Sequence, residues 1–236
     1  MKERIIRIDL NGVNCYLVKS NEGFILFDTG GPMYMDRKFN GRQDDLVKEL
    51  EKAGCFLGNL KLVVLTHGDI DHVFNTAYIR EKYNVKIALH HGDLPFVENP
   101  TVESFLKSSQ FRSAIYKIMS KLMRRYMHNL STNAIAYFNK FSPDILIDKN
   151  FSLMDFGLEA EILHIPGHTD GSICILFKDG SLICGDTFFN MFKPSIAVNA
   201  CDYQELDKSI RGLQKYNLAT IYPGHGKPFH FNRISI

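Results

Sequence analysis

The sequence predicts an α+β protein in which two β-sheets pack face to face and helices cover their outer faces. Two β-rich segments follow one another along the 236 residues, and each ends in a helix and a further strand. Such layering buries the apolar side of every element. A stretch with helical spacing separates the two segments. Because no repeat or low-complexity linker accompanies it, we expect one domain over 1–236 with a helical insertion at about 97–142.

The first β-rich segment begins with three short β-type runs separated by turn signals. Asn11-Gly12 and Gly23 mark the turns, which predicts an antiparallel meander. A helical pattern closed by a glycine, a continuous apolar run and a second helix then lead to another strand. In order, we expect strands at 4–9, 13–18 and 24–27, a helix at 44–53, a strand at 62–65, a helix at 74–83 and a strand at 86–90.

The second β-rich segment repeats this plan after the insertion. Its expected elements are strands at 145–147, 159–165, 173–177 and 181–184, a helix at 203–216 and a strand at 220–222. Apolar residues of the insertion recur every three or four positions, which places them on one face of a helix as an apolar stripe. These residues are Phe111, Ile115, Ile118, Met119, Leu122, Met123, Tyr126 and Leu130. Six basic residues and one acidic residue lie between 101 and 130. We expect the stripe to pack over a groove as a lid, with the basic face solvated; attraction of an anionic substrate and transient membrane contact are the alternatives.

Composition excludes several classes of protein. The 28 Lys and Arg nearly balance the 26 Asp and Glu, so nucleic acid is not expected as a partner. No apolar run approaches the roughly 18 residues of a bilayer span, which argues against stable membrane association. Charged residues interrupt the N-terminal apolar pairs, and the five cysteines form no C-x-x-C pair. We therefore expect a cytoplasmic protein with reduced thiols.

A dense group of polar side chains follows the apolar run at 62–65. His67, Asp69, Asp71 and His72 place two imidazoles and two carboxylates within six positions, which is costly at a strand end unless cations compensate them. Four more residues end strands beside a glycine in a tight turn: Asp28, His168, Asp186 and His225. Apart from Asp28, these residues are suited to hold two divalent ions with one carboxylate between them.

With these residues the chain resembles the metallo-β-lactamase superfamily, whose signature is H-x-H-x-D-H followed by a His, an Asp and a His. The resemblance extends from Asp28-Thr29-Gly30 to the Pro-Gly-His-Gly segment at 223–226. It implies a four-layer αβ/βα sandwich with the metals in a groove at one edge of the sheets. By this resemblance, the first metal is held by His67, Asp69 and His168. The second is held by Asp71, His72 and His225; Asp186 bridges the two, and Asp28 braces the ligand loops without binding metal.

Asp69 departs from the family pattern, which usually has His at that position. With Asp there, the charges of two divalent ions, three carboxylates and one hydroxide cancel, whereas the usual set leaves a net positive charge. A more anionic ligand set weakens the Lewis acid and favours harder ions. We expect zinc, with iron or manganese as alternatives. A single-metal site with Asp69 uncoordinated is the other alternative.

These residues lead to two enzyme hypotheses. The first is a dinuclear metal-dependent hydrolase of an ester, lactone, thioester or phosphoester in a small metabolite, in which a metal-bridging hydroxide attacks and Asp71 orients it or takes up a proton. The second resembles the metallo-β-lactamase domain of flavodiiron proteins, which carry Glu at the place of Asp69, and acts as a non-haem di-iron oxidoreductase on oxygen or nitric oxide. The sequence shows no flavin-binding module, so electrons would come from another protein. A metal-binding scaffold without turnover is a third class.

Two residues outside the ligand set are candidates for accessory roles. His164 lies on the strand that enters the His168 turn, and we expect it to support a ligand without binding metal. Lys193 follows the bridging Asp186 by seven residues, which suits contact with a substrate carboxylate or phosphate. The expected partner is thus a small molecule with an anionic group. The sequence leaves the oligomeric state open.

Overall fold

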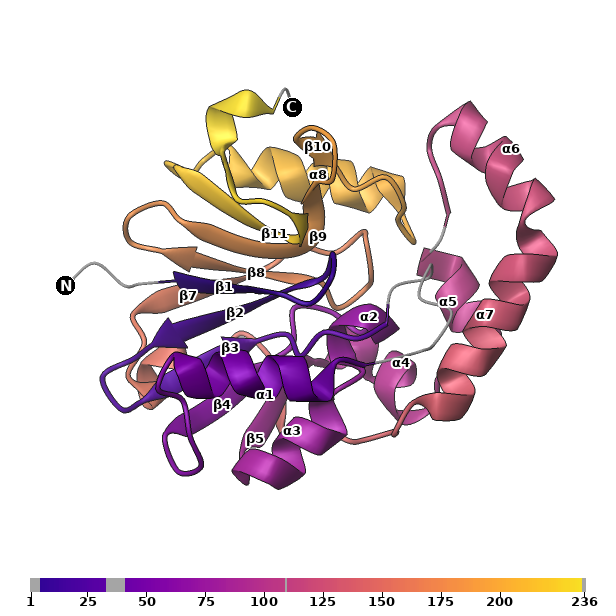
Figure 1. Ribbon diagram of the computed structural model, residues 1–236. Helices are drawn as coiled ribbons and strands as arrows, with labels where there is room; N and C mark the ends of the chain where they lie inside the picture. Colours follow the sequence, from indigo (N-terminus) through magenta and orange to yellow (C-terminus); the bar gives the residue numbers. More distant parts are fainter. Residues whose placement is uncertain (1–4, 33–40, 109, 235–236) are drawn as a thin grey trace.

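The computed structural model describes residues 5–32, 41–108 and 110–234 and contains two six-stranded sheets that pack face to face (Figure 1). The first half of the chain forms one sheet and the second half forms the other. Helices cover the outer face of each sheet. The predicted α+β sandwich is therefore confirmed.

The first sheet follows chain order from β1 to β6. Its strands are β1 (Ile5–Asp9), β2 (Asn14–Lys19), β3 (Phe24–Phe27), β4 (Leu60–Val64), β5 (Lys86–His90) and β6 (Ile145–Ile147). The first three form the predicted antiparallel meander, and β3 to β6 run parallel. Arg4, where the sequence predicts the first strand to begin, lies outside the described residues. Because β3 and β4 are parallel, the residues that follow them meet at one edge of the sheet.

The second sheet has the order β12-β11-β9-β8-β7, and β10 pairs with β9. Its strands are β7 (Ala160–His164), β8 (Ile173–Phe177), β9 (Leu182–Asn190), β10 (Ser195–Ile196), β11 (Thr220–Gly226) and β12 (Phe229–His230). β9 and β11 run parallel and extend well beyond the predicted strands at 181–184 and 220–222. The pairing of β9 with β11 continues through the glycine-containing turns, with shifts of register on both sides of Pro223. These turns are therefore bulges within the strands.

Eight α-helices and three short 3₁₀ helices complete the described chain. The α-helices are α1 (Gln43–Lys52), α2 (Ile70–Val73), α3 (Thr76–Tyr83), α4 (Leu94–Glu98), α5 (Val102–Ser108), α6 (Ala114–Leu122), α7 (Arg124–Tyr137) and α8 (Tyr203–Leu213). The 3₁₀ helices are η1 (His91–Asp93), η2 (Leu153–Phe156) and η3 (Phe231–Arg233). Leu46 of α1 and Ile79 of α3 pack on the first sheet, and Leu206 of α8 packs on the second. Among residues 5–32, 41–108 and 110–234, no helix combines the length and the apolar character needed to cross a bilayer.

The central core lies between the two sheets. Ile25 and Phe27 of β3 share one apolar cluster with Ile175 of β8 and Ile183 of β9. The alternate β3 residue Leu26 belongs to the cluster under the helices instead. Both faces of this sheet are therefore covered, which explains why its strands read as continuous apolar runs.

The helical insertion, α4 to α7, connects β5 to β6 and extends beyond the sandwich (Figure 1). Most of the apolar stripe that was expected to pack over a groove is exposed in the described structure, so the role of the insertion as a lid stays a prediction. No residue of α6 is buried: Ile118 is 60% exposed and Leu122 is 82% exposed. Of the stripe, only Leu130 is buried. Helical spacing correctly predicts which residues share a face, but it does not specify what that face contacts.

Candidate metal centre

The seven predicted ligands converge at one edge of the sandwich. His67 and Asp69 lie between β4 and α2, and α2 carries Asp71 and His72. The second half contributes three residues, His168 from the β7–β8 loop, Asp186 from β9 and His225 from β11. All seven side chains are buried. The edge formed by the parallel strands of both sheets therefore brings the two halves of the chain together.

The ligand atoms form two groups around Asp186, and one residue of each group, His67 and His72, also lies together with Asp186. Potential ligand atoms of His67, Asp69 and His168 all lie within 4.8 Å of one another, as do those of Asp71, His72 and His225. These are the two sets that the family resemblance implies. Asp186 lies between them: its Oδ1 is 3.3 Å from His72 Nε2, and its Oδ2 is 3.8 Å from His168 Nε2 and 3.3 Å from His225 Nε2. This carboxylate is in position to bridge two ions.

Each imidazole is held at Nδ1 and presents Nε2 to the centre. His72 Nδ1 lies 2.9 Å from Asp28 Oδ2, and His67 Nδ1 lies 3.0 Å from the Thr66 hydroxyl. His168 Nδ1 is 3.0 Å from the carbonyl oxygen of Asn199, and His225 Nδ1 is 2.8 Å from that of Gly12. Carbonyl and carboxylate oxygens only accept, so these Nδ1 atoms carry the proton. A metal ion at the centre would therefore bind Nε2, the arrangement typical of metal-binding histidines.

Asp28 stabilises this orientation from behind the ligands. Its carboxylate accepts hydrogen bonds from the backbone N–H of Thr66 at 2.7 Å and from the Thr66 hydroxyl at 2.8 Å, as well as from His72. The Thr66 hydroxyl donates to Asp28, so its oxygen accepts from His67. Asp28 has a φ of 60°, a backbone conformation that is uncommon for a non-glycine residue. Its three hydrogen bonds hold it there, and one buried carboxylate thus orients a ligand in each group.

Several buried polar atoms at the centre have no hydrogen-bond partner in the described structure. They are Nε2 of His67 and of His72, and Oδ1 of Asp69 and of Asp186. Leaving a buried polar atom unpaired costs about 1–3 kcal/mol. Divalent cations would satisfy all four atoms, because imidazole and carboxylate are good ligands for zinc, iron and manganese. The donor set therefore fits a pair of metal ions.

The electrostatics of the centre favour bound positive charge. Burial lowers the pKa of His168 and of His225, but the neighbouring carboxylates outweigh it and raise these pKa values to about 9 and about 10. Asp69 acts on His168, and Asp186 and Asp71 act on His225. Burial and its histidine neighbours lower the pKa of His67. Burial also lowers the pKa of His72, but Asp186, Asp28 and Asp71 outweigh it and raise this pKa. The carboxylates thus favour protons on three of the four imidazoles, and metal ions would replace those protons.

Two glycines are required by close approach at the centre. A Cβ at Gly224 would lie 2.2 Å from Asp186 Oδ1, and a Cβ at Gly185 would lie 2.5 Å from the Thr66 hydroxyl oxygen. Gly185 also has a positive φ of 47°. Any larger residue would displace a ligand or its support, which explains the glycines beside the predicted ligands.

Two residues that the sequence did not predict connect the ligand loops, Asp93 and Asn199. Asp93 accepts hydrogen bonds from the backbone N–H of Gly68 and Gly171, each at 2.8 Å, and from the Thr169 hydroxyl at 2.7 Å. It therefore joins the loop of His67 to the loop of His168. Asn199 holds His168 through its carbonyl. Neither residue lies near a ligand in sequence. Two of the donors to Asp93 are backbone N–H groups and the acceptor of Asn199 is a backbone carbonyl, and such groups leave no sequence signal.

The two accessory candidates differ in position. His164 is exposed, hydrogen-bonds through Nε2 with the Asp170 carbonyl at 3.0 Å, and stacks on His90 with ring centroids 4.0 Å apart. These contacts do not bring it to a candidate ligand. Lys193 lines a cavity of about 460 Å³ that opens onto Asp69, Asp71 and Asp186.

Comparisons with known proteins identify related sequences and a shared fold. The family model described as the Metallo-beta-lactamase superfamily matches residues 8–225. The chain is 27% identical over 228 residues to the probable metallo-hydrolase MJ0888 of Methanocaldococcus jannaschii, covering 93% of this chain and 92% of that protein. It is 23% identical over 231 residues to the hydroxyacylglutathione hydrolase GloC of Haemophilus influenzae, covering 96% and 91% respectively. The solved structure of TTHA1623 in a di-iron-bound form has a TM-score of 0.65 at 21% identity, covering 97% of this chain and 95% of that one.

Proposed function

We propose that this chain, which belongs to the metallo-β-lactamase superfamily and is a hydrolase of that fold, uses two divalent ions to hydrolyse an ester-like bond of a small molecule. The observation that carries this proposal is the pairing of the ligand atoms. Two three-residue groups lie on either side of Asp186, and a cavity opens directly onto them.

The residues of the centre have distinct roles in this proposal. When bound, two divalent ions would lower the pKa of a coordinated water to near neutrality and polarise the oxygen of the scissile bond. Asp71 lines the cavity, and its Oδ2 is 3.4 Å from His225 Nε2. This carboxylate would orient the attacking water and accept its proton. Lys193, in the cavity wall, would bind an anionic group of the substrate.

The metal content and the bond specificity can be tested together. We expect protein purified without oxygen to hold two metal ions per chain and to hydrolyse at least one member of a panel of esters, thioesters, lactones and phosphodiesters. Asp71→Asn should reduce turnover at least a hundredfold, whereas His230→Gln, which alters an exposed histidine on β12, should leave it unchanged. Absence of bound metal in protein supplied with zinc, iron and manganese would contradict the proposal.

A second candidate function is a di-iron oxidoreductase acting on oxygen or nitric oxide. Asp69 supports it because a carboxylate in this position makes the ligand set more anionic and better suited to iron. The di-iron-bound form of TTHA1623 supports iron as a metal for this fold. The two functions differ in their spectra: an iron-to-protein ratio near two with redox-sensitive absorbance, and no hydrolysis across the panel, would favour the oxidoreductase.

A further inference from the structure

The cavity at the metal centre is adjacent to a second cavity in the helical insertion. The first has a volume of about 460 Å³, and the second has a volume of about 430 Å³. Tyr116 of α6 lines both, and its side chain is partly exposed. The two cavities therefore meet at this ring.

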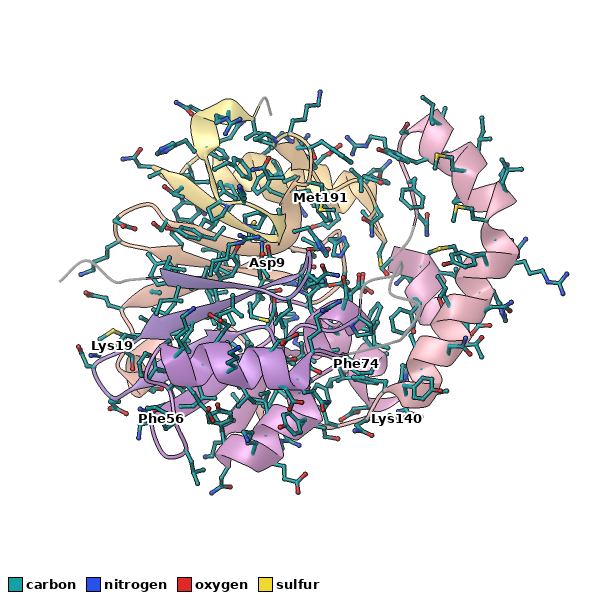
Figure 2. The ribbon with its side chains drawn as sticks, viewed as in Figure 1. Asp9, Lys19, Phe56, Phe74, Lys140 and Met191 are labelled. Carbon is teal, nitrogen blue, oxygen red and sulfur yellow. The ribbon has the colours of Figure 1, made fainter. Side chains whose placement is uncertain are left out.

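Apolar side chains dominate the walls of both cavities. In the first, the residues away from the ligands are chiefly Phe189, Met191, Phe192 and Val198. Figure 2 shows Met191 at the end of β9, on the side of the second sheet toward α6. The second cavity is lined by Leu106, Phe111, Tyr116, Met119, Ser120, Lys121, Met123, Arg124 and Met127. Its lining includes two basic residues and no acidic residue, so an apolar ligand would have cations beside it.

Within the part of the chain that the structure describes, much of the face of α6 and α7 that lines the second cavity is exposed. Met119, Met123 and Met127 recur at four-residue steps after Tyr116, which places them on one face. Met119 is 47% exposed and Met123 is 42% exposed. Methionine side chains are flexible and polarizable, and they adapt to ligands of varied shape. An apolar ligand in this cavity would remove that surface from water.

The segment of the insertion from the end of α5 to the start of α6 is bonded to α8 and to Asn199, which lie close to the metal centre. Arg112 forms an ion pair with Asp207 of α8 at 2.7 Å, and its backbone N–H donates to the Tyr203 hydroxyl at 2.9 Å. The Asn199 side-chain amide donates to the Ser108 carbonyl at 3.0 Å, while the Asn199 carbonyl holds His168. The second cavity therefore has a defined position relative to the reactive centre.

We propose that the two cavities form one binding site for the acyl chain of the substrate, which is an ester or thioester of a medium-chain carboxylic acid. This inference rests on the proposed hydrolase function. The acyl carbonyl lies at the metal centre, and the chain passes Tyr116 toward Met119 and Met123. Hydrolysis breaks the bond between the acyl carbon and the oxygen or sulfur of the leaving group. Water supplies the new oxygen of the carboxylate; one of its two protons goes to the leaving group and the other is released to solvent.

The first test is the dependence of hydrolysis on acyl-chain length. We expect kcat/KM for 4-nitrophenyl esters to rise about a hundredfold from acetyl to octanoyl, since each fully buried methylene adds up to about fourfold. Met119→Glu should remove most of this rise, because it places a charge where the acyl chain would lie. Ile118→Glu is the matched control, because Ile118 is an exposed neighbour on the same helix that does not line the cavity. Both side chains are substantially exposed, so both variants should fold.

The second test measures binding without turnover. Calorimetry should show that octanoate binds the wild-type protein at least tenfold more tightly than butanoate, and that Met119→Glu, but not Ile118→Glu, removes the difference. Equal rates for acetyl and octanoyl esters, or binding that is independent of chain length, would overturn the acyl-chain inference and leave the hydrolase proposal intact. If no ester is hydrolysed but octanoate binding behaves as expected, the proposed reaction is wrong and the cavity assignment stands.

Discussion

The two ligand groups of the metal centre differ in what holds their histidines. In the group of Asp71, His72 and His225, both imidazoles are fixed by the first β-meander. Asp28, directly after β3, holds His72, and Gly12, in the β1–β2 turn, holds His225. In the group of His67, Asp69 and His168, the Asn199 loop holds His168 and is itself bonded to the insertion through Ser108.

This difference indicates that the two metal positions are not equivalent. The group with His72 is anchored to the sandwich, and Asp28 contacts His72 directly, whereas it reaches His67 only through the Thr66 hydroxyl. The group with His168 is connected to the part of the molecule that we propose binds substrate, and it contains the unusual Asp69. We therefore expect the ion at the Asp69 group to be held less tightly and to respond more to changes near the substrate site.

Asp186→Ala should have the largest effect, because this carboxylate contacts histidines of both groups. We expect the metal content to fall below one ion per chain and turnover to fall by roughly a thousandfold or more. Elemental analysis and hydrolysis of the best substrate provide the measurement. Retention of both ions would show that the two positions do not share Asp186.

Asp69→Ala should separate the two groups. It removes a ligand from one group only, so we expect one ion to be lost, the other to be retained, and turnover to fall about a hundredfold or more. Asp69→His restores a ligand at this position and should restore the second ion. Two ions with full turnover in Asp69→Ala would show that Asp69 is not a ligand.

Asp28→Asn should weaken the other group. The amide cannot supply the negative charge that His72, held at 2.9 Å, receives from Asp28, and changes of this kind lower metal affinity by roughly 10- to 100-fold. The loss should appear at the position with His72, as measured by competition with a chelator. Asp28 also supports His67 through the Thr66 hydroxyl. An equal loss of metal affinity at both positions would therefore show that the two groups do not differ in their dependence on Asp28.

Asn199→Ala should have the smallest effect. The carbonyl that holds His168 remains, but the hydrogen bond to the Ser108 carbonyl is lost, at a cost of about 1 kcal/mol. We expect KM for the octanoyl ester to rise a few-fold, with little change for the acetyl ester and in metal content. A change confined to metal content would indicate that Asn199 supports the ligand and not the insertion.

Most of the strands and the candidate ligands could be predicted from the sequence, because both leave local patterns. Alternation and turn residues mark β1 to β3, and His67 to His72 form a compact motif after a buried strand. The lengths of β9 and β11 were missed because their ligand turns are bulges that continue the pairing. The acceptors of Gly12 and Asn199 are backbone carbonyls, which no side chain reveals. The exposed position of α6 depends on tertiary contacts that its periodicity does not encode.

The most direct test is anomalous X-ray scattering from crystals grown with zinc or, separately, with iron. The account predicts two peaks, one within bonding distance of His67, Asp69 and His168 and the other within bonding distance of Asp71, His72 and His225, with Asp186 between them. Crystals with ample metal that show no peak among these seven side chains would contradict it.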